Sequence, residues 1–229
     1  MNMKEHGIIF NAEMVRAILD GRKTQTRIIM KPQPVPINGG DNHVWYCEKI
    51  DASLDVKDAL QDGNVGWYGL ISSVCPLGGV GDRLYVREKF SRLESFGFFD
   101  SAVPYETPDF WYWADGEPEW GNWTRPQSGA VMPRNASRIS LEVTGVRVER
   151  LRDADDMTLL DELGDMLDDC HSVAGRAFNH AEHYDIAGID VGMMPEMHGF
   201  KAWWDKVNGS GSFDSNPWVW VIEFKQIQG

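Results

Sequence analysis

The end of the chain places the strongest constraint on the fold. Residues 217–224 read PWVWVIEF, and one face of this stretch carries Trp218, Trp220, Ile222 and Phe224 at the two-residue spacing of a β-strand. A strand with an apolar face is not stable alone in water, so it requires neighbouring strands. We expect it to pair with strands near the start of the chain or within residues 139–150.

Two earlier stretches give clear signals of secondary structure. Residues 11–20 read NAEMVRAILD, with Asn11 as a suitable N-cap, apolar residues at helical spacing, and Gly21 as a stop. This pattern predicts a helix. Residues 137–151 alternate apolar and polar side chains, which predicts a long strand, and Gly145 within them indicates a β-bulge.

The stretch between the long strand and the closing strand has a different character. Residues 152–206 hold 13 Asp and Glu against four Lys and Arg, and their first part has leucines and methionines at helical spacing. Residues 199–209 predict a second short helix. Residues 171–198 are rich in Gly and Met, and we expect a long, mobile loop that lies near a cleft as a lid.

The order of these elements favours an α+β fold. A strand, a helix, several antiparallel strands, a helical insertion and a closing strand fit a small β-barrel with flanking helices and an inserted acidic helical segment. We expect a single domain over residues 1–229, with insertions at 37–75 and 152–198.

Composition narrows the class of protein. The chain is 42% hydrophobic and 25% charged, as ordinary soluble domains are. No apolar run approaches the roughly 20 residues of a membrane span, and the N-terminus does not resemble a signal peptide. Cys47, Cys75 and Cys170 cannot all pair within one chain and fit a reducing compartment. We therefore expect a cytoplasmic protein that does not contact a membrane.

Charge argues against a general nucleic-acid coat but leaves a local site open. The net charge is −13, which opposes binding through many phosphate contacts. Residues 1–40, however, hold six basic residues against three acidic ones. Because salt confines each charge to about 10 Å, a cationic end can still bind a phosphate.

The densest cationic segment is GRKTQTR, residues 21–27. One interpretation is that Arg22 and Lys23 lie favourably near the negative end of the preceding helix. The other is a site for an anionic or polar ligand, built with Thr24, Thr26 and Arg27. The residues alone leave both interpretations open.

Four segments together resemble the ASCH family, which is related to the PUA domains of RNA-modifying proteins. These segments are ILDGRKTQTR (18–27), GDRLYVRE (81–88), the strand 137–150 and the closing 217–224. The chain also resembles the longer ASCH proteins of tailed phages and prophages. The resemblance implies a PUA-like barrel with a cleft where the first segment meets the second, and a nucleotide or nucleic-acid ligand.

The resemblance also implies a catalytic set. Some small bacterial ASCH proteins are amidohydrolases that remove an acyl group from the exocyclic nitrogen of modified cytidine. Their lysine, threonine and glutamate correspond here to Lys23, Thr26 and Glu162, with Asp161 as the rival acid. Lys23 and Thr26 would face opposite sides of a regular strand, so they converge only if the chain turns or bulges after Gly21.

Further candidate residues accompany this set. Arg22, Thr24, Arg27, Arg87 and Glu88 are candidate ligand-binding residues, and an Arg87–Glu88 ion pair is the structural alternative for the last two. Trp111, Trp113 or Trp123 at a cleft edge would stack a base. His180 and His183 have the spacing of two metal ligands on a helix, but without a repeated Cys-x-x-Cys we expect neither a metal nor a cofactor.

These features support three hypotheses for function. The protein is a hydrolase of an N4-acylated cytidine, a module that binds single-stranded RNA or DNA without chemistry, or a phage protein whose acidic surface binds another protein. The sequence does not decide among them.

Overall fold

A five-stranded sheet forms the centre of the protein. The computed structural model describes residues 3–37, 42–61, 70–95, 106–183 and 192–227. The strand order is β1-β6-β10-β11-β2. The strands are β1 (Glu5–Ile9), β6 (Arg83–Arg87), β10 (Ser140–Arg150), β11 (Trp218–Ile227) and β2 (Gln25–Ile29). β1 and β6 are parallel, and the other pairs are antiparallel.

The closing strand finds both of its expected partners. β11 pairs with β10 on one side and with β2, near the start of the chain, on the other. Its burial goes further than one apolar face, because Val219 and Val221 are as buried as Trp220 and Ile222. β11 is therefore a central strand covered on both faces.

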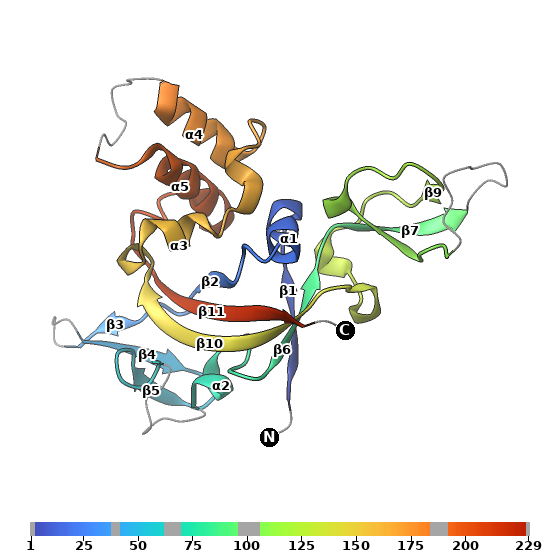
Figure 1. The fold of residues 1–229 in the computed structure, drawn as a ribbon. Helices are drawn as coiled ribbons and strands as arrows, with labels where there is room; N and C mark the ends of the chain where they lie inside the picture. The colour runs from blue at the N-terminus through green and yellow to red at the C-terminus, as the bar shows by residue number, and fades with distance from the viewer. Residues whose placement is uncertain (1–2, 38–41, 62–69, 96–105, 184–191, 228–229) are drawn as a thin grey trace.

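The bulge predicted in the long strand is present. The register between β10 and β11 shifts between Val143 and Gly145, so Thr144 is the extra residue. A Cβ on Gly145 would lie 2.7 Å from the carboxylate of Glu223, which explains why glycine occupies this position. The bulge bends β10 and helps to give the sheet its curvature (Figure 1).

The sheet is curved but not closed. In the part of the chain that the structure describes, β1 and β2 are its two edges and do not pair with each other. The α+β class is therefore confirmed, and the expectation of a closed barrel is not. In place of strand pairing, residues of α5 lie beside both edges at the β1–β2 gap.

Two smaller sheets flank the central one (Figure 1). The first consists of β3 (Val35–Pro36), β4 (His43–Cys47) and β5 (Ala52–Asp55), accompanied by helix α2 (Leu70–Val74). The second extends from the body as an arm made of β7 (Phe90–Ser95), β8 (Phe110–Tyr112) and β9 (Asn122–Trp123). Three short 3₁₀ helices complete this region: η2 (Trp113–Asp115), η3 (Gly129–Val131) and η4 (Arg134–Ala136).

Helices occupy the side of the sheet opposite β3–β5 (Figure 1). They are α1 (Ala12–Leu19), α3 (Asp156–Leu160), α4 (Val173–His183) and α5 (Pro195–Asn208), with the 3₁₀ turns η5 (Leu151–Asp153) and η6 (Gly164–Leu167). Asn11 caps α1 as predicted, accepting a hydrogen bond from the Met14 amide at 2.9 Å. Met14, Val15 and Ile18 are buried on the apolar face of α1, whereas Leu19 at its end is 42% exposed.

The expected loop over residues 171–198 is largely helical. α4 covers residues 173–183, and α5 begins at Pro195, four residues before the predicted helix, since Pro is favourable in the first turn. The buried residues Ala174 and Gly175 pack α4 onto its neighbours. Residues 184–191 lie outside the described residues. The expectation of a loop is therefore wrong for residues 173–183 and 195–198, while the expectation of a mobile lid stays a prediction.

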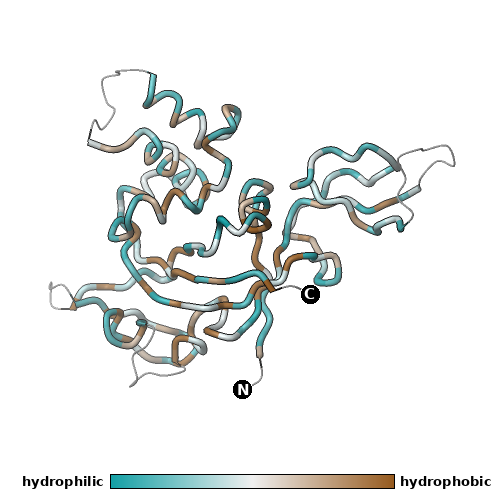
Figure 2. Tube along the Cα trace, viewed as in Figure 1, coloured by the Kyte–Doolittle hydropathy of each residue, from teal (hydrophilic) through white to brown (hydrophobic). Residues whose placement is uncertain are grey.

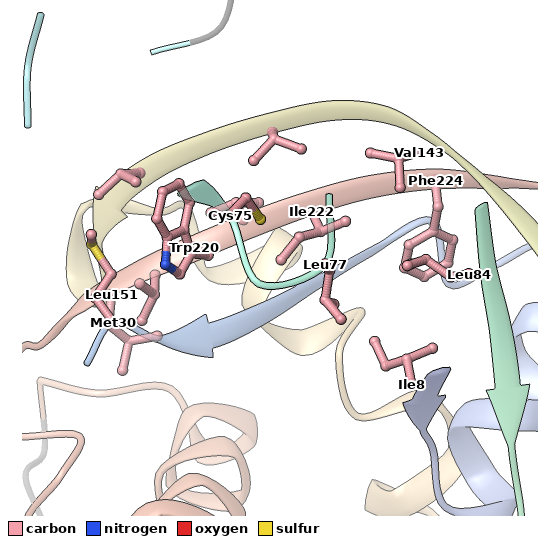
Figure 3. Packing of buried hydrophobic residues seen from close by; sticks show 14 of the residues in the cluster. Ile8, Met30, Cys75, Leu77, Leu84, Val143, Leu151, Trp220, Ile222 and Phe224 are labelled. Atoms are coloured by element: carbon pink, nitrogen blue, oxygen red, sulfur yellow. The ribbon is translucent and has the colours of Figure 1, made fainter. Parts of the chain in front are cut away.

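The main core packs against both faces of the sheet, since Val219 and Val221 belong to the same cluster as Trp220 and Ile222. Figure 3 shows Ile8, Leu84, Ile222 and Phe224 converging within this core, with Leu77 entering between the strands. Hydrophobic residues are concentrated where β1 leads into α1 (Figure 2). A separate small cluster at the base of the arm consists of Phe90, Met132 and Ala136.

Candidate functional site

The turn between α1 and β2 brings Lys23 to the same side as Thr26. Gly21 has a φ of +73°, and the amides of Arg22 and Lys23 both donate to the Ala17 carbonyl, at 2.8 and 3.0 Å. β2 begins only at Gln25. Lys23 therefore lies in the turn rather than in the strand, and the alternation that would separate it from Thr26 does not apply.

Glu162, which belongs to the acidic insertion, contacts three residues of the GRKTQTR segment. Its Oε2 accepts hydrogen bonds from Lys23 Nζ at 3.0 Å and from Thr26 Oγ1 at 3.3 Å, and its Oε1 accepts one from Arg27 Nη1 at 3.0 Å. Lys23 also donates to the Glu162 carbonyl at 3.3 Å. Lys23 is 2% exposed and Glu162 is 1% exposed. The structure thus gathers all three candidate catalytic residues in one buried cluster.

The rival acid lies outside this cluster. Asp161 is the C-cap of α3 and is exposed, whereas the next residue turns inward through a hydrogen bond from its amide to the Leu159 carbonyl at 3.1 Å. The neighbouring carboxylate, that of Glu162, is therefore the one available to Lys23 and Thr26.

A glycine makes this inward turn possible. Gly164 has a φ of +58°, and a Cβ there would lie 2.9 Å from the Glu13 carbonyl oxygen and 3.1 Å from Ala17 Cβ on α1. The turn after α3 therefore packs directly against α1, which holds Glu162 beside Lys23.

We expect Gly164→Ala to lower the free energy of unfolding by about 1–3 kcal/mol, because alanine is strained at this φ and also collides with α1. Urea denaturation measures the change. Gly21→Ala is the matched control, since Gly21 also has a positive φ but nothing within 4 Å of the added Cβ. Equal losses in the two variants would show that the contact with α1 is unimportant.

The remaining residues of the GRKTQTR segment do not offer a free charge. Arg22 is exposed and pairs with Asp20 and Asp165, each at 2.9 Å. Arg27, 7% exposed, is held by Glu162 and by Glu149. Thr24 is exposed, and its carbonyl accepts a hydrogen bond from the Phe224 amide. The candidate ligand-binding roles of Arg22 and Arg27 as phosphate contacts are thus not supported by their surroundings.

Arg87 and Glu88 have partners of their own. Arg87 donates to the Ala130 carbonyl. Glu88 is 1% exposed and receives two hydrogen bonds from Arg138, at 2.9 and 3.1 Å. Burial raises the pKa of Glu88, although the hydrogen bonds from Arg138 oppose that shift. The alternative of an Arg87–Glu88 ion pair is wrong, because Glu88 pairs with Arg138 and Arg87 with the Ala130 carbonyl. The ligand role of these two residues stays a prediction.

A cavity of about 480 Å³ adjoins the buried cluster. It lies between the edge strands β1 and β2, and its polar lining residues are Asn11, Thr26, Arg27 and Asn208. Its apolar walls come from both edges of the sheet, from α1, from the segment before β6 and from α5, and they include Phe10, Met14, Ile28, Leu77, Trp203 and Trp204. The gap left by the unclosed sheet is therefore a mainly apolar pocket that contains one charged side chain, that of Arg27.

The aromatic residues at this pocket are not those expected. Trp111 and Trp123 pack against each other in the arm, with ring centroids 5.7 Å apart, and Trp113 donates to Ser91 Oγ at 2.9 Å. The indoles at the pocket are Trp203 and Trp204 of α5. The adjacent Trp203 and Trp204 were a sequence signal for this pocket. Neighbouring residues on a helix point in different directions, so one indole can be buried in the core while the other lies at a partly exposed surface.

The described histidine and cysteine residues do not form a metal site. His180 and His183 both lie on α4, but the described residues contain no group of three or more His, Cys, Asp or Glu side chains arranged to hold a metal ion. Cys47 and Cys75 are buried free thiols, and burial raises the pKa of Cys75 to about 12, which leaves it unreactive.

Comparison with known proteins gives no match: no family model, no curated protein and no solved structure is significantly similar to the chain. None of the helices in the described ranges combines the length and the apolarity needed to cross a membrane.

Proposed function

We propose that the protein is a PUA-like amidohydrolase of the ASCH type that removes an acyl group from the exocyclic nitrogen of a modified cytidine. The observation that carries this proposal is the buried cluster of Lys23, Thr26 and Glu162, of which Thr26 also lines the adjoining aromatic cavity. The curved sheet, with α1 between β1 and β2, is compatible with a PUA-like arrangement. Trp203 and Phe10 supply faces on which a nucleobase stacks.

In this proposal Glu162 is the acid–base group. Thr26 Oγ1 donates to Glu162 Oε2, so this carboxylate is the base that takes the proton of the Thr26 hydroxyl, or of a water held by it, as the oxygen attacks the acyl carbon. The ammonium of Lys23 lies beside the same oxygen and stabilises the negative charge that forms on the acyl oxygen.

The same carboxyl group then completes the reaction. As the C–N bond breaks, Glu162 gives its proton to the departing exocyclic amine. If Thr26 is the nucleophile, a water hydrolyses the resulting ester by the same route and restores the hydroxyl. The net change is one amide and one water converted to one amine and one carboxylic acid.

The charge balance of the site favours a free nucleoside over a nucleic-acid strand. Lys23, Arg22 and Arg27 are each paired with at least one carboxylate. A phosphate would have to displace these partners, whereas a neutral nucleoside would not. Binding of a nucleic-acid strand would also release counterions and would weaken steeply with salt. Such binding requires several unpaired cations, and the site offers few.

The test is turnover of N4-acetylcytidine and of N4-acylcytidines with larger acyl groups by the purified protein, at low salt and at high salt. We expect cytidine to be released at rates that change little with salt. Binding assays with single-stranded and duplex RNA and DNA run in parallel. Tight, salt-sensitive binding of a strand with no turnover of any acylcytidine would overturn the proposal in favour of a non-catalytic binding module.

A further inference from the structure

Glu149 is a half-buried member of the charge network that the motif did not identify. It lies on β10, its side chain is 18% exposed, and its Oε1 accepts from Arg27 Nε at 3.1 Å and from Arg27 Nη2 at 3.0 Å. The strands that carry the two residues are not neighbours, because β11 lies between them. Arg27 therefore reaches across Val221, its register partner, to meet a carboxylate two strands away.

All three nitrogens of the Arg27 guanidinium donate hydrogen bonds to oxygen atoms of the protein. Nε and Nη2 go to Glu149, while Nη1 goes to Glu162 Oε1 at 3.0 Å and to the Thr158 carbonyl at 3.3 Å. Its side chain is 1% exposed. Arg27 also borders the cavity, so the contact with Glu149 fixes a side chain that lies between the buried cluster and the pocket.

This arrangement sets the orientation of the Glu162 carboxylate. Arg27 holds Oε1, which leaves Oε2 for both Lys23 and Thr26. The charges also balance, since two cations, Lys23 and Arg27, face two carboxylates, Glu149 and Glu162. Loss of Glu149 would leave the buried group with one uncompensated positive charge.

We propose that Glu149 is a positioning residue for this site, acting through Arg27 to aim Glu162 Oε2 at Thr26. Its part in turnover rests on the proposed function, but its hold on Arg27 does not. Glu149 Oε2 is itself held by Arg147 Nε at 3.1 Å, and Arg147 pairs in turn with Glu223. These contacts form a relay of ion pairs, Glu223–Arg147–Glu149–Arg27–Glu162. It begins at the partly exposed surface of the sheet and ends at the buried catalytic set.

The first test does not require activity. In an NMR spectrum of ¹⁵N-labelled protein, the Arg27 Nε–H signal, assigned by its loss in Arg27→Lys, should be protected from exchange with water. Glu149→Gln should abolish this protection. Glu223→Gln is the matched control, because it removes a 45% exposed carboxylate from the outer end of the same relay, and it should leave the Arg27 signal unchanged.

The second test separates positioning from general stability. Outer hydrogen-bond partners at metal sites typically contribute 10–100-fold, and we expect Glu149→Gln to lower kcat on the best acylcytidine by about that factor with KM close to wild type. Glu149→Asp, which keeps the charge, should recover part of the loss. This variant also carries the test if Glu149→Gln does not fold.

The outcomes separate the two proposals. Absence of turnover by the wild type would overturn the proposed function, while the Arg27 signal would still decide whether Glu149 holds Arg27. An Arg27 Nε–H signal that stays protected in Glu149→Gln, or an unchanged kcat in an active enzyme, would overturn the positioning role.

Discussion

Glu162→Gln is expected to turn over an N4-acylated cytidine about 10²–10⁴ times more slowly than the wild type, the usual contribution of a general acid–base group. Glutamine keeps the shape of the side chain, and its carbonyl oxygen can still accept a hydrogen bond, but the amide cannot take a proton from Thr26. The loss should therefore appear in kcat. Single-turnover rates, measured with enzyme in excess over substrate, give the chemical step directly.

Asp161→Asn is the matched control for this change. It removes the same charge from the adjacent residue, but Asp161 is exposed and lies outside the cluster around Lys23. We expect turnover close to the wild-type rate. A result in which Asp161→Asn is the slow variant and Glu162→Gln is active would show that the acid–base group has been assigned to the wrong residue.

The second large effect concerns stability. Glu162→Leu should lower the free energy of unfolding by about 3–5 kcal/mol, because it leaves the buried cations Lys23 and Arg27 without the carboxylate that they share. Adding Lys23→Met to this variant should restore part of the loss, since one buried charge is then removed and Arg27 keeps Glu149. Urea denaturation of the two single variants and the double variant measures the coupling between the residues.

An exposed ion pair provides the comparison for this prediction. Lys225 and Glu142 are 3.2 Å apart on the sheet, with side chains 61% and 38% exposed. Glu142→Gln should change the free energy of unfolding by less than about 1 kcal/mol. If Glu162→Leu were no more costly than Glu142→Gln, the cluster would not be desolvated in solution, and the central premise of the site would fail.

Local signals predicted the elements whose stability depends mainly on their own residues. Asn11 and Gly21 bracket α1, and the cap and the positive φ appear where the pattern placed them. Gly145 marks the bulge in β10 for a reason visible in the sequence, since a glycine inside an alternating strand has few other uses. The closing strand required partners and found them on both sides.

Contacts between distant segments accounted for the differences. The sheet was expected to close into a barrel, but a cavity bordered by α5 separates the edge strands β1 and β2. The residue pattern within either strand does not indicate which strand lies beside it. Residues 173–183 form a helix in which Ala174 and Gly175 are buried, although the Gly- and Met-rich composition of residues 171–198 suggested a loop. Arg87 and Glu88, neighbours in sequence, are drawn to separate partners at the base of the arm.

The sequence by itself determined α1, the long bulged strand, the closing strand and the α+β class, and through the GRKTQTR segment it pointed to Lys23 and Thr26. Only the tertiary structure decided that Glu162 rather than Asp161 meets them, that Glu149 completes the charge balance, and that Trp203 and Trp204 border the pocket. The physical reason is the range of the interactions. Caps, turns and alternation act over a few residues, whereas the buried ion network joins residues 23, 27, 149 and 162, whose proximity depends on how β2, β10 and the turn after α3 pack together.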